Sequence, residues 1–141
     1  MLRISVDNLD KLFEAISGKQ TLYIPADRND GAAEYKKFES GMKMSEKLNT
    51  LRSAKDFFFP QTENLVDFKM EGKKIEVIDN RKESEDFVVF GVRACDARSF
   101  TILDKVFLVD PVDSYYKNRR DHGTIVTMAC TRPAETCFCQ T

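Results

Sequence analysis

The four cysteines of this chain lie in its last third, and their number and grouping indicate one metal site. Cys95 stands apart, whereas Cys130, Cys137 and Cys139 fall within ten residues of one another. Four thiolates are what a tetrahedral zinc ion or a cubane iron–sulfur cluster requires. The spacing C-x34-C-x6-C-x-C matches neither paired C-x2-C zinc knuckles nor the C-x2-C-x2-C-x3-C run of ferredoxins. Spacing alone leaves an iron–sulfur cluster, a zinc ion and structural or redox thiols open.

Three arginines accompany these cysteines. Arg93 and Arg98 stand on either side of Cys95, and Arg132 follows Cys130. A cubane held by four thiolates carries net negative charge, which neighbouring guanidinium groups would stabilise. We therefore expect Arg93, Arg98 and Arg132 to lie at the cofactor site and to tune its charge.

Two apolar runs predict the strands that bring the first two cysteines together. Residues 87–92 and 124–129 are continuous apolar runs, typical of strands buried on both faces. Two helical segments between residues 100 and 120 separate them, which predicts strand, helix, helix, strand with the two strands parallel. Cys95 and Cys130 each follow one of these strands at its carboxyl end, where open α/β sheets gather ligands. We expect the two thiols to lie close together.

The whole chain, residues 1–141, is expected to form a single domain. The fold class is α/β: a small mixed or parallel sheet flanked by helices, with a β-hairpin and a cysteine-rich, cluster-binding loop at residues 130–141. The preceding segments predict, in order, a helix at 9–16, a strand at 21–25, a loop at 27–34, mostly helical or irregular structure at 35–58, and the hairpin at 65–78.

The overall composition excludes several classes of protein. Hydrophobic residues make up 42% and charged residues 32%, and the net charge is −1, so nothing favours nucleic acid or an acidic membrane surface. No apolar run approaches the roughly 18 residues of a membrane span. The N-terminus also lacks the apolar segment of a signal peptide. We therefore expect a cytoplasmic protein, in which clustered cysteines bind metal or react more often than they form disulfides.

The other polar motifs offer little chemistry. His122 is the only histidine, and beside charged neighbours it is expected at a helix end. Without a Ser–His signal, hydrolytic triads have no support. Neither of the glycine-rich nucleotide-binding motifs occurs in the sequence. Arg119 and Arg120 are expected to pair with surface carboxylates.

Five segments occur in the same order in one known family. They are GVRACDARSF at 91–100, LDKVF at 103–107, YYKNRR at 115–120, ACTRP at 129–133 and TCFC at 136–139. On these motifs the chain resembles the N-terminal domain of the iron–sulfur β subunits of cytosolic sulfhydrogenases and of the A subunit of anaerobic sulfite reductase. The resemblance is dense over residues 87–141, about two fifths of the chain, and looser before them.

The resemblance implies an electron-transfer function without catalysis by this chain itself. By position, Cys95, Cys130, Cys137 and Cys139 match family cysteines, which implies that they bind one [4Fe–4S] cluster. The family's partner is a flavin-containing NAD(P)H-oxidoreductase subunit, and its members continue into a domain with further iron–sulfur clusters. We expect this chain to be the N-terminal part of such a subunit, relaying electrons within a hydrogenase or sulfite reductase complex of anaerobic metabolism. The alternative is a structural or docking domain with a four-cysteine zinc site or no metal.

Overall fold

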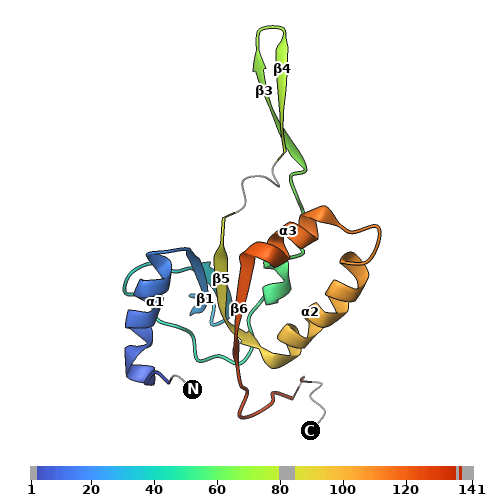
Figure 1. Ribbon diagram of the computed structural model, residues 1–141. Helices are drawn as coiled ribbons and strands as arrows, with labels where there is room; N and C mark the ends of the chain where they lie inside the picture. Colours follow the sequence, from blue (N-terminus) through green and yellow to red (C-terminus); the bar gives the residue numbers. More distant parts are fainter. Residues whose placement is uncertain (1–2, 80–84, 136, 138–141) are drawn as a thin grey trace.

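A computed structural model of the chain describes residues 3–79, 85–135 and 137 (Figure 1). Its helices and strands are, in chain order, η1 (Val6–Asn8), α1 (Leu9–Ser17), β1 (Thr21–Asp27), β2 (Ala33–Lys37), η2 (Ala54–Phe57), β3 (Val66–Glu71), β4 (Lys74–Asp79), β5 (Phe87–Arg93), α2 (Ala94–Phe107), α3 (Ser114–His122) and β6 (Gly123–Met128), where η marks a 3-10 helix.

The larger of two sheets has four strands in the order β2-β1-β5-β6. β1, β5 and β6 run parallel, and β2 is antiparallel to β1. α2 and α3 connect β5 to β6, so the predicted strand–helix–helix–strand unit is confirmed (Figure 1). The expected α/β class, with a small mixed sheet, helices and a separate hairpin, is confirmed as well.

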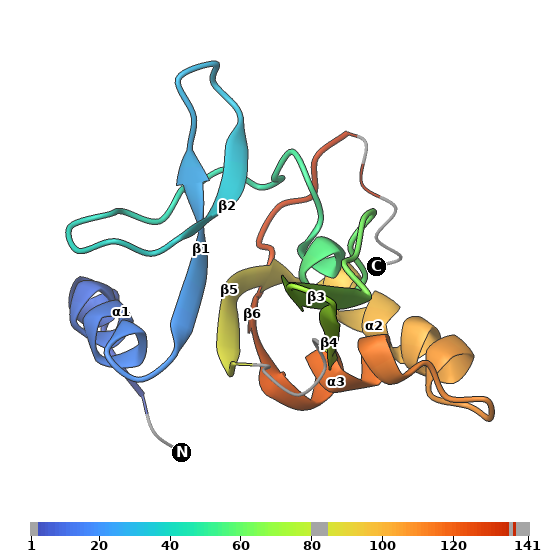
Figure 2. The same ribbon diagram turned by 90° about the horizontal axis from the view of Figure 1, so that it is seen from above.

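Helices cover both faces of the central strand β5. Figure 2 shows α1 on one side of the sheet and α2 and α3 on the other. Val88 and Val89 are adjacent in the chain and point to opposite faces, as in any strand, so each belongs to a different core. The two cores are Phe13, Leu22, Ile24, Phe38 and Val88 on the α1 side, and Ala54, Phe58, Val89, Val92, Phe100 and Tyr116 on the α2–α3 side.

Two expectations about strands are corrected. Ala33–Lys37 forms β2, although it was expected to be partly loop and partly helical or irregular. This edge strand is polar, so it lacks the apolar signal of a strand; its pairing with β1 defines it. β6 was expected to be buried on both faces, but it lies at the other edge of the sheet and its residues are half-buried or exposed.

The predicted hairpin is confirmed as β3 and β4, joined at Gly72, which has the positive φ of +62° that such a turn requires. It forms a sheet of its own and projects from the rest of the molecule (Figure 1). Within the described residues, none of the helices has the length and hydropathy to cross a membrane.

Candidate metal centre

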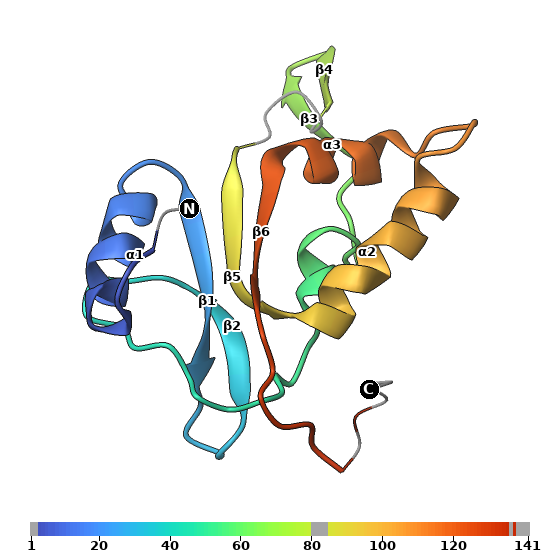
Figure 3. The same cartoon turned by 60° about the horizontal axis from the view of Figure 1, so that its bottom comes forward.

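The first two cysteines lie at the same edge of the sheet. Arg93, the last residue of β5, pairs with Met128, the last residue of β6. Cys95 lies two residues beyond Arg93, in the first turn of α2, and Cys130 lies two residues beyond Met128. Figure 3 shows the chain leaving β6 at the end of the sheet where β5 passes into α2. The prediction that Cys95 and Cys130 follow parallel strands at their carboxyl ends is therefore confirmed.

A β-bulge in β5 sets this register. Pairing with β6 proceeds without a break up to Phe90, skips Gly91 and resumes at Val92. The extra residue shifts the alternation of side chains, so Val89 and Val92 share one core although they are three residues apart. Without the bulge, β5 would be shifted by one residue along β6, and Cys95 and Cys130 would no longer follow a matched pair of residues.

Gly91 is required at the bulge for two reasons. Its φ of +79° lies in the left-handed region, which strains any residue with a Cβ. A Cβ here would also lie 3.2 Å from the ring of Pro25 in β1. The Tyr35 hydroxyl donates a hydrogen bond to the Gly91 carbonyl over 3.4 Å. The sequence analysis missed this residue, although a glycine inside a strand pattern is the usual signal of a bulge.

Arg93 joins the cysteine edge to the long segment between β2 and η2. Its Nε and Nη2 donate hydrogen bonds of 2.5 Å to the carbonyl oxygens of Leu48 and Lys47, respectively. The same segment is attached to β1 through buried Ser45, whose N–H donates to the Pro25 carbonyl over 2.7 Å. A guanidinium has five N–H donors, so Arg93 keeps donors beyond these two bonds.

Charged groups surround the first turn of α2. Cys95 is exposed there, at the positive end of the helix dipole. Its neighbour Asp96 forms an ion pair of 2.7 Å with Lys55 of η2, which the sequence analysis did not anticipate. Arg98 and Arg132 are both exposed. Charges of both signs thus lie near the start of α2, and Cys95 is accessible there.

Tyr35 is affected by the same charges. Burial, aided by the negative charge of Asp96, raises the pKa of Tyr35 to about 12, and the positive charge of Arg93 opposes part of this shift. The phenol therefore stays protonated at neutral pH, which allows it to donate to the Gly91 carbonyl.

The segment after β6 carries the remaining cysteines. Cys130 is exposed and Cys137 is half-buried. The Ala134 N–H donates to the Cys137 sulfur over 3.2 Å, and the Cys137 N–H donates to the Ala134 carbonyl over 3.0 Å. This turn gives the Cys137 sulfur a hydrogen-bond donor from the backbone.

The described residues do not by themselves form a metal site. Among residues 3–79, 85–135 and 137, no three His, Cys, Asp or Glu side chains lie close enough together to hold a metal ion. Cys95, Cys130 and Cys137 therefore do not converge as a group of three, and Cys139 lies outside the described residues. The strand ends and the thiol chemistry fit a cluster or a zinc ion, and the completed site stays a prediction.

An ion pair fastens α2 to α3 and so fixes the crossover between the two cysteine strands. Arg120 binds Asp104 through two bonds of 2.8 and 2.9 Å, and the Tyr116 hydroxyl donates to the same carboxylate over 2.7 Å. The Arg120 guanidinium also lies about 5.5 Å above the rings of Phe58 and Phe100. The hydrogen bond from Arg120 holds the pKa of Asp104 below its ordinary value.

The other candidates from the sequence have structural roles. His122 is the last residue of α3, as expected, and its Nδ1 lies 2.8 Å from a carboxylate oxygen of Asp86. Arg119 pairs with Glu63 over 2.5 Å, near the base of the hairpin. Arg119 and Arg120 both pair with carboxylates, as expected, and both are half-buried.

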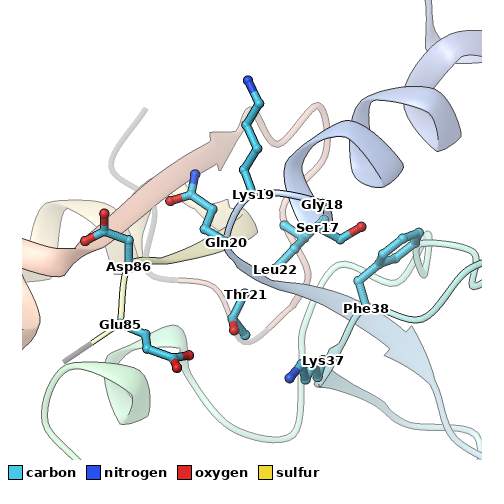
Figure 4. Close-up of a pocket in the computed structure, with 10 residues that line it drawn as sticks. All are labelled: Ser17, Gly18, Lys19, Gln20, Thr21, Leu22, Lys37, Phe38, Glu85 and Asp86. Carbon is cyan, nitrogen blue, oxygen red and sulfur yellow. The ribbon is translucent and has the colours of Figure 1, made fainter. Parts of the chain in front are cut away.

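A pocket of about 530 Å³ lies at the opposite end of the sheet from the cysteines (Figure 4). It is formed where α1 turns into β1, together with the end of β2 and the residues that precede β5. Its lining carries both lysines and carboxylates but no cysteine, so it supplies no further thiolate ligand. The lining residues are Ser17, Gly18, Lys19, Gln20, Thr21, Leu22, Lys37, Phe38, Glu85 and Asp86.

Comparison with known proteins finds a similarity to a sulfhydrogenase subunit. No family model and no solved structure matches the chain. The chain is 37% identical over 91 residues to the protein named sulfhydrogenase 2 subunit beta from Pyrococcus furiosus. The matched region covers 64% of this chain and 25% of that protein, so the chain spans only about a quarter of the length of its relative. The similarity supports a relationship between this chain and that subunit family.

Proposed function

We propose that this chain is an electron-transfer domain that binds one [4Fe–4S] cluster through its four cysteines. One observation carries the proposal. Arg93 and Met128 pair as the last residues of the adjacent parallel strands β5 and β6, and each is followed two residues later by a cysteine, Cys95 or Cys130. Ligands far apart in sequence meet at one site only if the fold brings their strands together, which this sheet does. Cys137 and Cys139 would complete the set.

The chain's own residues would hold and tune the cluster. The positive end of α2 lies at Cys95, where it would stabilise the negative charge of a thiolate. The Ala134 N–H is already directed at the Cys137 sulfur. Arg93, Arg98 and Arg132 would supply positive charge at the same edge, and Arg93 would also hold the 47–48 backbone there. When bound, a cubane cluster accepts and donates single electrons.

The relative's description as a subunit supports a role within a complex. In this proposal the domain receives electrons from a flavin-containing NAD(P)H-oxidoreductase subunit and passes them to further iron–sulfur clusters of a hydrogenase or sulfite reductase. The domain itself catalyses no reaction on a substrate, and it works in the cytoplasm. The carboxyl edge of β5 and β6 would be the side that faces the other redox centres.

Reconstitution without oxygen tests the proposal. The purified chain is incubated with iron and sulfide, desalted, and analysed for bound iron, sulfide and zinc and for its visible and electron paramagnetic resonance spectra. We expect about four irons per chain and a broad visible absorption, as for a cubane cluster. Cys95→Ser and Cys130→Ser should each abolish most of this iron. Bound zinc without iron would instead support the structural domain.

A further inference from the structure

The hairpin of β3 and β4 has one apolar face that lies in solvent. In the antiparallel register Phe68 pairs with Val77 and Met70 with Ile75, and residues paired across the strands point to the same face. The apolar side chains of this face are Val66, Phe68, Met70, Ile75 and Val77. These five side chains are between 48% and 67% exposed. Asp79, which pairs with Val66, lies on the same face at the base of the hairpin.

A hairpin of this kind is not expected to remain uncovered. Two strands without a third strand or a packed helix are at best marginally stable in water. The contacts that join this hairpin to the rest of the molecule lie at its base, where the Tyr115 hydroxyl donates to the Leu65 carbonyl over 2.9 Å. Figure 1 shows the tip well away from the larger sheet. The apolar face therefore needs a cover from another surface.

The charges of the hairpin favour an uncharged cover. On its other face Lys69 pairs across the strands with Glu76, and Lys74 pairs with Glu71. Opposite charges thus face each other in these two pairs, whereas Asp67 and Asp79 pair with apolar residues. The hairpin is left with only a small excess of negative charge, which offers little to a strongly basic or acidic partner. The net charge of the chain is −1, so two copies of it would repel each other only weakly.

We propose that the apolar face of β3 and β4 is an interface with a second copy of this chain. The two hairpins would pack face to face about a two-fold axis, each presenting the same five side chains to the other. From their exposed fractions these side chains offer at most about 500 Å² per copy, if each is given the lower end of the 150–250 Å² that an aromatic side chain buries. Two copies would bury at most about 1,000 Å², the size of a weak, reversible interface. This inference does not rest on the proposed cluster.

The test is the oligomeric state of the chain in solution. Sedimentation velocity is run at several concentrations up to about 100 µM, with a thiol reductant to prevent disulfide dimers through the exposed cysteines. The wild type should form a dimer that dissociates on dilution. Phe68→Ser and Val77→Ser should each weaken it about tenfold or more, as expected for the centre of an interface.

Lys69→Ser is the matched control, because it changes the opposite face of the same hairpin. It should leave the dimer unchanged. Hydrogen exchange at residues 66–79 of the monomeric variants shows whether the hairpin still forms, so loss of the dimer can be separated from loss of the hairpin. Two results overturn the proposal: a wild type that stays monomeric at all concentrations, which assigns the face to a different partner, or a dimer that Phe68→Ser and Val77→Ser do not weaken.

Discussion

Arg93 of β5 and Met128 of β6 pair as the last residues of two parallel strands, and each is followed two residues later by a cysteine. A sheet edge can hold a ligand with residues that are far apart in the chain because parallel strands end together. Here the pairing of Arg93 with Met128 depends on the bulge at Gly91, which takes one residue of β5 out of the register. The bulge is therefore the part of the fold on which the proposed site depends most directly.

Gly91→Ala should impair the cysteine site more than it impairs the fold. A residue with a Cβ at a φ of +79° costs about 1–2 kcal/mol. The chain can relieve this cost by changing the bulge, which would shift Cys95 relative to Cys130. Supporting residues outside the ligands typically change metal affinity by about 10- to 100-fold, and we expect a loss of about tenfold in iron bound at limiting iron. Iron content after reconstitution and urea unfolding measure the two effects.

Gly41→Ala is the control for that variant. Gly41 has a φ of +83°, and no atom lies within 4 Å of the place its Cβ would take. The backbone strain is therefore similar, whereas the position lies outside the cysteine strands. If Gly41→Ala and Gly91→Ala lose the same amount of iron, the bulge has no special part in positioning the cysteines.

Cys137→Ser should lower the iron retained by the chain to a small fraction of the wild-type amount. A thiolate is the soft ligand that iron–sulfur clusters use, and a serine hydroxyl replaces it poorly. Glu135→Gln changes a neighbouring exposed residue without touching a thiol, and it should keep the iron of the wild type. Both proteins are reconstituted without oxygen and compared by iron and sulfide analysis. Equal iron in the two variants would show that Cys137 is not a ligand.

Asp104→Asn should destabilise the domain at neutral pH and change its response to acid. In the folded protein the bond from Arg120 lowers the pKa of Asp104 from its ordinary 3.8. The folded state thus binds fewer protons, so the stabilisation is complete above about pH 4 and is lost as the pH falls through the lowered pKa. We expect the variant to lose about 1.5–3 kcal/mol at pH 7, the range for hydrogen bonds to charged groups.

Urea unfolding at pH 7 and at pH 3 measures both effects, since the wild type and Asp104→Asn should differ less in acid. Asp121→Asn serves as the comparison, because Asp121 pairs with Lys117 on the exposed surface of α3. Surface pairs of this kind contribute less than about 1 kcal/mol. A loss at Asp121 as large as that at Asp104 would contradict the special role of the α2–α3 ion pair.

The sequence predicted those parts of the fold that have a strong apolar pattern. The run at residues 87–92 predicted β5 because that strand is buried on both faces, and alternation around Gly72 predicted the hairpin. β2 has polar residues at an edge, so only its pairing with β1 reveals it. An apolar run does not by itself decide burial either: Phe58 is fully buried, whereas its neighbour Phe59 is 48% exposed and packs against the ring of Phe107.

The candidate site was predictable to the extent that it follows from topology. The carboxyl ends of β5 and β6 placed Cys95 and Cys130 at one edge, as the sequence indicated. The contacts of Arg93 with the carbonyls of Lys47 and Leu48 were not predictable, because that segment lacks regular structure and reaches the edge only through tertiary contacts. Among the described residues Cys95, Cys130 and Cys137 do not come together as a group of three, and Cys139 lies outside those residues. The convergence of all four cysteines therefore stays a prediction.

Binding of a cluster should increase the protection of the segment after β6. Residues 129–133 are all exposed. Ordering the backbone costs about 1–2 kcal/mol of conformational entropy per residue, and little burial offsets that cost in this segment. Ligation of Cys130 and Cys137 would fix both ends of this segment. We therefore expect amide exchange between them to slow about tenfold or more on reconstitution, following the linkage of binding to local stability.

Hydrogen exchange followed by mass spectrometry compares the metal-free and the reconstituted chain. The amides of β6 are the internal reference, because they pair with β5 in either state and should change little. The Cys95→Ser variant should show no gain of protection after residue 129 when treated with iron and sulfide. If the metal-free chain already protects residues 130–137 as strongly as β6, packing alone orders the segment, and the cluster would contribute nothing to its order.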